Sequence, residues 1–186
     1  MIVYVHGFNS SPASFKAGLL QRELERRGSG AAFLAPALPH RPAAAVAMLE
    51  QLLGDRQHVS LVGSSLGGYY STFLAERHGW RAVLVNPSVR PYETLAGFIG
   101  RQKNLYTAEQ YDFTAEHVAE LRALDVAAIT QPGRYLLLVT TGDELLDYRQ
   151  AAAKYRGARQ VIVPGGDHGF SAFADHLDTV LEFARA

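Results

Sequence analysis

The sequence of 186 residues contains no cysteine, so it forms no disulfide bond and offers no thiolate ligand to a metal. A chain without cysteine fits a reducing compartment, and we expect the protein in the cytoplasm. No basic leader or cleavage site precedes the apolar run at residues 2–5. No apolar run approaches the roughly 18 residues that a membrane span needs, so we expect no membrane span.

The sequence also lacks an excess of charge, because 18 lysines and arginines balance 18 aspartates and glutamates. This balance gives no electrostatic reason to expect nucleic acid or an anionic membrane as a partner. No cluster of metal ligands is visible, and we expect neither a metal nor an organic cofactor. The length predicts one domain over residues 1–186, and the composition predicts no particular oligomeric state.

Short β-branched runs alternate with longer amphipathic segments along the chain. The expected strands cover 2–5, 31–35, 58–63, 82–86, 135–141 and 159–164. The expected helices cover 12–27, 42–53, 66–78, 145–155 and 171–185. Ser11 is the predicted N-cap of the first of them. Strands that alternate with helices in this way predict βαβ units. We therefore expect an α/β protein, a three-layer αβα sandwich with a mainly parallel sheet of about six strands.

One long segment, 87–133, interrupts this alternation and contains no convincing strand. Its aromatic residues include Tyr92, Phe98, Tyr106, Tyr111 and Phe113. An extra pair of helices on the surface would account for it. Because long insertions in compact domains are usually functional, we favour a short helical lid whose aromatics line a site for an apolar substrate.

The stretch Gly63-Ser64-Ser65-Leu66-Gly67 fits the pattern G-x-S-x-G between an expected strand and an expected helix. In this turn Ser65 is the predicted nucleophile, and the two flanking glycines allow a close approach of the backbone. The backbone N–H of Leu66 then points at a developing oxyanion. A plain strand-to-helix turn is the alternative. A phosphate loop is disfavoured because the Walker lysine and the G-x-G-x-x-G pattern are missing.

A serine nucleophile needs a base, and the base needs a carboxylate that orients it. His168 directly follows the last expected strand and is the predicted base, with a surface-loop histidine as the alternative. Asp143 follows the fifth expected strand and is the predicted orienting residue. Its rivals are Glu144, Asp147 and Asp167. The order Ser65, Asp143, His168 is the nucleophile–acid–histidine order of α/β-hydrolases.

The loop HGF after the first strand supplies a second oxyanion donor, the backbone N–H of Phe8. Asn9 and Ser10 brace this loop or form a plain polar turn. We further predict substrate contacts from Asn9, Tyr106 and Tyr111.

The stretches YVHGFNSSP, LVGSSLGGYY, VNPSVRP, TGDELLDYRQA and GGDHGF resemble those of α/β-hydrolases, and of the small YqiA-like esterase family in particular. The resemblance runs from Tyr4 to about Phe173. It implies a compact hydrolase whose sheet begins at the usual third strand, with activity on short acyl esters and with acyl-CoA thioesters as candidate substrates. It assigns the triad to Ser65, Asp143 and His168. The sequence departs from the family where GGDHGF has aspartate in place of asparagine before the histidine.

The sequence therefore predicts a serine hydrolase that cleaves carboxylic esters or thioesters of small molecules through an acyl-enzyme on Ser65. A different class of function is a non-catalytic α/β-hydrolase module that binds a small molecule or a protein partner. A third hypothesis keeps the triad but changes the bond that is cleaved, to an amide or a carbon–carbon bond.

Overall fold

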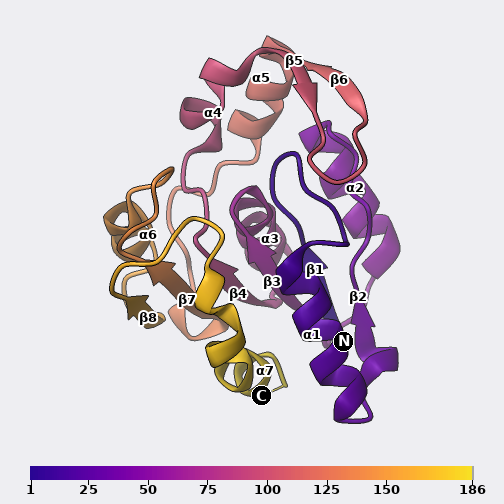
Figure 1. The fold of residues 1–186 in the computed structure, drawn as a ribbon, viewed down its shortest axis with the longest axis vertical. Coiled ribbons are helices and arrows are strands. Elements are labelled where there is room, and N and C mark those ends of the chain that lie inside the picture. Colours follow the sequence, from indigo (N-terminus) through magenta and orange to yellow (C-terminus); the bar gives the residue numbers. More distant parts are fainter. Residues whose placement is uncertain (186) are drawn as a thin grey trace.

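The computed structural model describes residues 1–185, which form a six-stranded sheet in the order β2-β1-β3-β4-β7-β8 (Figure 1). The strands are β1 (Ile2–Val5), β2 (Phe33–Leu34), β3 (Ser60–Ser64), β4 (Arg81–Val85), β7 (Tyr135–Thr140) and β8 (Arg159–Val163). Every neighbouring pair in this sheet is parallel. The carboxyl ends of its strands therefore meet at one edge.

The central strands are buried on both faces of the sheet. All four residues of β1 and all six of β7 are buried. Alternate residues enter different cores: Ile2 and Tyr4 pack on one side, whereas Val3 and Val5 pack on the other. Unbroken apolar runs such as IVYV and YLLLVT are what a parallel sheet covered on both faces requires.

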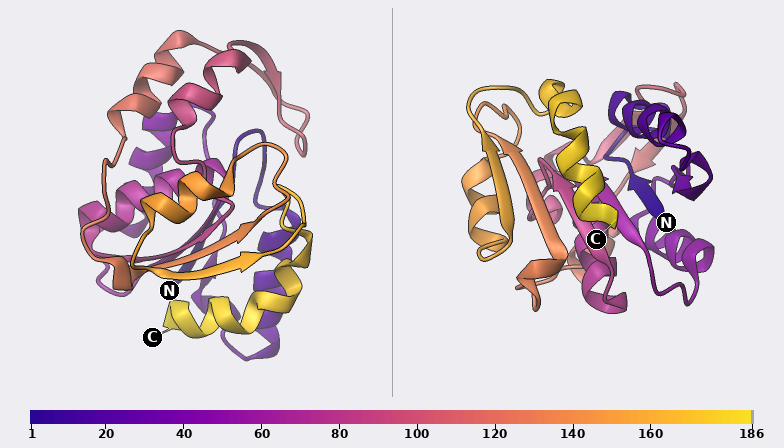
Figure 2. Two further views of the ribbon diagram at one scale, coloured as in Figure 1. Left: turned by 90° about the vertical axis from the view of Figure 1, so that its left-hand side faces the viewer. Right: turned by 90° about the horizontal axis from the view of Figure 1, so that it is seen from below.

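Helices cover both faces of the sheet (Figure 2). α1 (Phe15–Arg26) and α7 (Leu177–Arg185) share a core with one face. α2 (Pro42–Leu53), α3 (Leu66–His78) and α6 (Tyr148–Lys154) share a core with the other. The predicted three-layer αβα sandwich with six parallel strands is thus confirmed.

Between β4 and β7 the chain forms α4 (Pro91–Thr94), β5 (Gly100–Lys103), β6 (Gln110–Phe113) and α5 (Ala115–Ala123). The expectation of a purely helical insertion is wrong, because β5 and β6 pair as an antiparallel hairpin. GRQK is polar and largely exposed, and QYDF alternates exposed polar with buried aromatic residues, so neither has the apolar run of a central strand. The antiparallel pairing of β5 with β6 stabilises these two strands in place of burial in the central sheet. Figures 1 and 2 place the insertion at the end of the molecule opposite α7.

Several predicted boundaries are corrected by the structure. The first helix begins at Phe15 rather than at residue 12, and Ser14 rather than Ser11 occupies its N-cap position. The Ser11 hydroxyl instead accepts a hydrogen bond from the Ala13 N–H, in a turn that precedes the helix.

Three further elements are shorter than predicted. Only Phe33–Leu34 of the segment 31–35 is a strand, because a 3₁₀ turn occupies Gly30–Ala32. The closing segment 171–185 is divided into a 3₁₀ helix, Ser171–His176, and α7. The helix expected at 145–155 is α6, which begins at Tyr148 after an Asp147 cap. Two more 3₁₀ turns lie at Ala96–Phe98 and Pro132–Arg134.

Within residues 1–185, no helix is long and apolar enough to cross a membrane. The same residues contain no group of three or more histidine, aspartate or glutamate side chains placed to hold a metal ion.

The amino-terminal turn of α3 lies directly against β1 and β3. A Cβ atom on Gly67 would lie 1.9 Å from the carbonyl oxygen of Val5. A Cβ atom on Gly63 would lie 2.4 Å from the carbonyl oxygen of Gly67. Both obstacles are backbone atoms of packed elements, which have little freedom to move. The glycines of the G-x-S-x-G pattern are therefore needed for the packing itself.

Gly67→Ala should lower the free energy of unfolding by about 3 kcal/mol or more, because β1 and α3 must separate to admit the methyl group. Urea denaturation monitored by circular dichroism measures this change. Gly97→Ala is the matched control, since nothing lies within 4 Å of its added Cβ, and its effect should stay within about 0.5 kcal/mol. A Gly67→Ala protein as stable as wild type would contradict the packing argument.

Candidate active site

Ser65 lies in the turn between β3 and α3, with φ at 54° and ψ at −119°. Few residues with a side chain adopt a positive φ, so this turn stores conformational strain. Three backbone hydrogen bonds of 3.0 Å hold it in place. The Ser65 N–H donates to the Val85 carbonyl, and the Ser65 carbonyl accepts from the N–H groups of Gly68 and Ser88. The turn thereby fixes the hydroxyl at the carboxyl edge of the sheet.

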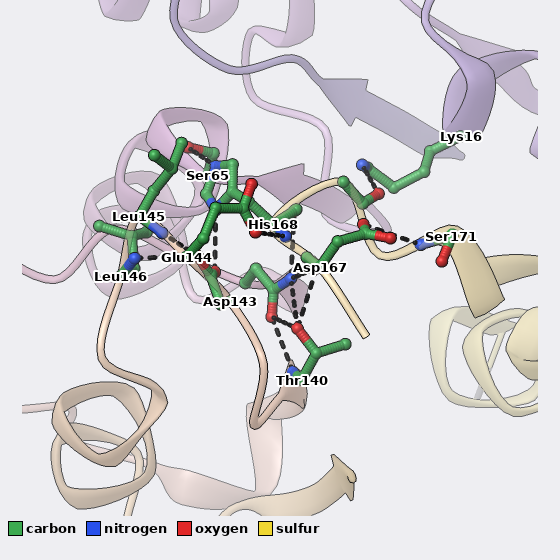
Figure 3. A network of polar contacts seen from close by, with 12 residues as sticks. Lys16, Ser65, Thr140, Asp143, Glu144, Leu145, Leu146, Asp167, His168 and Ser171 are labelled. Carbon is green, nitrogen blue, oxygen red and sulfur yellow. Dashed lines mark hydrogen bonds and ion pairs between the residues drawn. The ribbon is translucent and has the colours of Figure 1, made fainter. Parts of the chain in front are cut away.

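His168 reaches this hydroxyl from the loop that follows β8 (Figure 3). Its Nε2 lies 3.0 Å from Ser65 Oγ, and its Nδ1 lies 2.8 Å from Asp143 Oδ2. An ionised carboxylate only accepts hydrogen bonds, so Nδ1 carries the proton and donates to Asp143. Nε2 then has a free lone pair that accepts from the Ser65 hydroxyl. This arrangement can transfer a proton from the serine to the imidazole.

Asp143 follows β7, and its side chain is only 2% exposed. Its Oδ1 accepts hydrogen bonds of 2.9 Å from the N–H groups of both Leu145 and Leu146. Its Oδ2 faces His168. The two amides fix the carboxylate in one orientation, and that orientation in turn fixes the imidazole ring.

The three rival carboxylates have other partners. Glu144 accepts a 2.9 Å hydrogen bond from the backbone N–H of His168. Asp147 caps α6 by accepting from the Arg149 N–H at 3.0 Å. Asp167 accepts from the Ser171 N–H at 3.3 Å. Asp143 is therefore the carboxylate of this group that contacts the His168 ring.

Asn86 and Thr140, for which no role was predicted, hold the histidine loop. The Asn86 side-chain amide donates to the carbonyls of Asp167 and His168 at 3.0 and 3.1 Å, and its oxygen accepts from the Thr140 N–H at 2.9 Å. The Thr140 hydroxyl donates to the same Asp167 carbonyl at 2.9 Å (Figure 3). Both side chains are buried. The signal for Asn86 in the sequence is a polar residue at the end of the otherwise apolar expected strand 82–86.

Both predicted oxyanion donors lie beside the serine. Leu66 is the first residue of α3, so its N–H has no partner within the helix. Phe8 lines the same cavity as Ser65. Gly7, which precedes Phe8, lies so close to Ser65 that a Cβ atom on Gly7 would be 3.1 Å from Ser65 Cβ. His6 fixes this loop, since its Nε2 accepts from the Leu38 N–H at 3.1 Å and its Nδ1–H donates to the Gly7 carbonyl at 3.0 Å.

A cavity of about 450 Å³ opens at Ser65 and His168. Its mouth is apolar, with the exposed side chains of Phe15, Leu105 and Tyr106. The buried part of its wall carries the hydroxyl groups of Tyr4, Ser14 and Ser64 and the ammonium group of Lys16.

Of the three predicted substrate contacts, Tyr106 alone lines this cavity. Asn9 and Tyr111 line a separate cavity of about 50 Å³, where the Tyr111 hydroxyl donates to Asn9 Oδ1 at 2.6 Å. These two residues therefore lie outside the Ser65 cavity, in one that Phe8 and Leu66 also line, and their contact with substrate stays a prediction. The alternation along β6 turns Tyr111 and Phe113 inward, toward the core, so that Tyr111 holds the hairpin against the loop after β1.

Comparison with known proteins places the chain among relatives of its own length. The model of the family described as "Uncharacterised protein family (UPF0227)" matches residues 1–185. A UPF0227 protein of Vibrio parahaemolyticus is 26% identical over 189 residues, which cover 98% of each chain. A UPF0227 protein of Pectobacterium carotovorum is 29% identical over 194 residues, again with 98% of each chain covered.

Solved structures with the same architecture include α/β-hydrolases. Alpha/beta hydrolase domain-containing protein 10 from mouse superposes with a TM-score of 0.70 and 15% identity, over 97% of this chain and 89% of that one. Est1E of Butyrivibrio proteoclasticus, with ferulic acid bound, superposes with a TM-score of 0.69 and 13% identity, over 98% and 86%. These likenesses confirm the predicted α/β-hydrolase fold.

The buried His6 predicts a specific dependence of stability on pH. Burial lowers the pKa of His6, so the folded protein keeps this ring neutral while the unfolded chain binds a proton near pH 6.5. The stability that the neutral ring contributes is therefore complete above about pH 6.5 and is lost as the pH falls toward the lower folded pKa. His6→Gln should lose less stability than wild type between about pH 7.5 and pH 5, measured by urea denaturation. Parallel losses in the two proteins would show that His6 does not contribute.

Proposed function

The chain belongs to the UPF0227 family, and we propose that it is a serine hydrolase that cleaves carboxylic esters or thioesters. The observation that carries the proposal is the continuous hydrogen-bonded series from Ser65 Oγ through His168 to Asp143, with contacts of 3.0 and 2.8 Å. A hydroxyl on a strained turn, a base within reach and a buried carboxylate behind it are the requirements of an activated serine. The hydrolases and esterases that share this fold support the same reaction class.

In the first half of the reaction, Ser65 Oγ attacks the acyl carbon and its proton passes to His168 Nε2. The carbonyl oxygen becomes an anion that the N–H groups of Phe8 and Leu66 stabilise. Asp143 stabilises the imidazolium that has formed. The bond between the acyl carbon and the leaving oxygen or sulfur then breaks, and His168 returns the proton to the leaving group.

In the second half, a water molecule gives a proton to His168 and attacks the acyl-enzyme. The bond between the acyl carbon and Ser65 Oγ breaks, and the proton returns to the serine. The products are a carboxylic acid and an alcohol or thiol. The atoms and protons balance with His168 as the one group that carries protons between the reactants.

The insertion at 87–133 contributes a wall of the site in this proposal. The backbone N–H of Leu105, at the hairpin tip, donates to the Asn9 carbonyl at 2.9 Å, and the Asn104 side chain donates to the Ser10 carbonyl at 2.8 Å. Tyr106 is thereby held at the cavity mouth. Phe113 of the insertion packs into the same core as the sheet. The chain is therefore one domain with a lid-like insertion in this proposal, rather than two domains.

The rival hypotheses make different predictions about Ser65. A module that only binds a ligand does not become acylated there. An amidase does become acylated, and differs only in the substrates that it turns over. We favour esters and thioesters of small molecules because of the resemblance to YqiA-like esterases, and the absence of cysteine supports a cytoplasmic site of action.

A fluorophosphonate probe should label wild-type protein on the peptide that contains Ser65, because only an activated hydroxyl reacts with it. Ser65→Ala should abolish labelling and lower ester turnover by at least about 10³-fold, while its circular dichroism spectrum stays that of wild type. Mass spectrometry identifies the adduct. Ser171→Ala, which changes another serine of the same cavity wall, should keep the adduct on Ser65. Labelling that persists in Ser65→Ala would contradict the mechanism.

Asp143→Asn should lower kcat by about 10³- to 10⁴-fold with little change in KM, because the amide no longer fixes the required tautomer of His168. Asp147→Asn is the matched control. It removes one charge four residues away, at the cap of α6, and should leave kcat within about twofold of wild type. Steady-state kinetics with a 4-nitrophenyl ester measure both variants. Equal effects of the two substitutions would argue against the assigned role of Asp143.

A further inference from the structure

The first turn of α1 lies in the wall of the cavity that contains Ser65, where Ser14, Phe15 and Lys16 follow one another. Lys16 is only 9% exposed. Its ammonium group donates a 2.6 Å hydrogen bond to the carbonyl of Gly169, the residue after His168 (Figure 3). An ammonium group has three N–H donors, so this contact leaves two of them free for a ligand in the cavity.

Ser14 occupies the N-cap position of α1 without capping it. A serine at this position normally accepts a hydrogen bond from an N–H of the first turn. Here the hydroxyl oxygen is buried and has no hydrogen-bond partner within residues 1–185. The first turn of this 12-residue helix also contains no acidic residue. The Ser14 hydroxyl, which lies beside the Tyr4 hydroxyl in the same wall, and the free amides of the first turn can therefore donate to an external acceptor.

Lys16 has no carboxylate oxygen within 4.0 Å among the described residues. Asp167, which lines the same cavity, instead accepts from the Ser171 N–H. Burial lowers the pKa of Lys16, and the more distant Asp167 opposes that shift. A buried cation without a close counterion is costly, and an anionic ligand removes that cost.

We propose that Lys16, the Ser14 hydroxyl and the first-turn amides of α1 bind a carboxylate that the substrate carries in addition to its scissile ester. This inference rests on the proposed hydrolase function and specifies its substrate class. Lys16 brings one positive charge to a cavity that Asp167 also lines, so a singly charged carboxylate suits the site better than a doubly charged phosphate. The apolar mouth formed by Phe15, Leu105 and Tyr106 contacts the uncharged part of such a substrate.

The substrates in this class are half-esters or half-thioesters of dicarboxylic acids, and esters whose alcohol bears a carboxylate. Two pairs of test esters show whether the acyl part or the alcohol part of the substrate carries the carboxylate. The acyl pair is mono-4-nitrophenyl glutarate and 4-nitrophenyl valerate. The glutarate carries a carboxylate in place of the terminal methyl group of the valerate. The leaving-group pair is 4-carboxyphenyl valerate and phenyl valerate.

Wild type should prefer the charged member of one pair by at least about tenfold in kcat/KM, the size that a charge-assisted hydrogen bond supports. Lys16→Met should remove this preference, and Ser14→Ala should reduce it. Arg22→Met is the matched control, because Arg22 is an exposed cation of the same helix that does not line the cavity. The Arg22→Met protein should prefer the charged ester by the same factor as wild type. The pair that responds to Lys16→Met identifies the side of the ester that carries the carboxylate.

A wild type without preference in either pair would overturn the inference. So would a Lys16→Met protein that loses the same factor for charged and neutral esters, since Lys16 would then only position the loop of His168. Glutarate binding, measured by isothermal titration calorimetry, separates this inference from the proposed function. Binding that Lys16→Met abolishes, in a protein that hydrolyses no ester, would support the anion site and overturn the hydrolase. Ester hydrolysis without glutarate binding and without a preference for charged esters would support the hydrolase and overturn the anion site.

Discussion

The close contact between the backbone of α3 and the backbones of β1 and β3 is the constraint on which the rest of the site depends. Gly67 lies so near the Val5 carbonyl that no side chain fits between them. This contact presses the start of the helix onto the strand ends and forces Ser65 into a positive φ. The strain is offset by the packing of the layers on either side. Without the two glycines, the serine hydroxyl would not reach the edge where the other polar groups converge.

The histidine loop is held by a buried polar network as well as by the apolar packing of Phe170. Asn86, at the end of β4, binds two carbonyls of that loop and also the backbone of β7 through Thr140. Buried amides of this kind are stable only when each donor and acceptor is paired, so the network permits few alternative arrangements. Rigid support of this kind keeps the His168 ring within hydrogen-bond distance of both Ser65 and Asp143.

The cavity combines two environments that favour different parts of one ligand. Its mouth carries exposed apolar side chains from α1 and from the hairpin tip, whereas its interior carries hydroxyl groups and a buried ammonium. A purely apolar acyl chain would offer no acceptor to the Ser14 hydroxyl or to the N–H groups of Lys16 that do not bond Gly169. A substrate with an apolar segment and an anionic end would satisfy both regions, which is why the proposed substrate class departs from the apolar one expected from the aromatic content of the insertion.

The sequence by itself determined the α/β architecture and brought Ser65, Asp143 and His168 to attention, because strand periodicity, glycine spacing and strand ends are local features. Only the tertiary structure decided which residues hold that site and which face the cavity. The hydrogen bonds from Tyr111 to Asn9 and from Asn86 to the His168 carbonyl join positions that lie far apart in the chain. The strands β5 and β6 are close in the chain, but they lack the apolar runs that mark the central strands. A polar side chain acquires its role from the partner that the fold brings to it, and no local pattern records that partner.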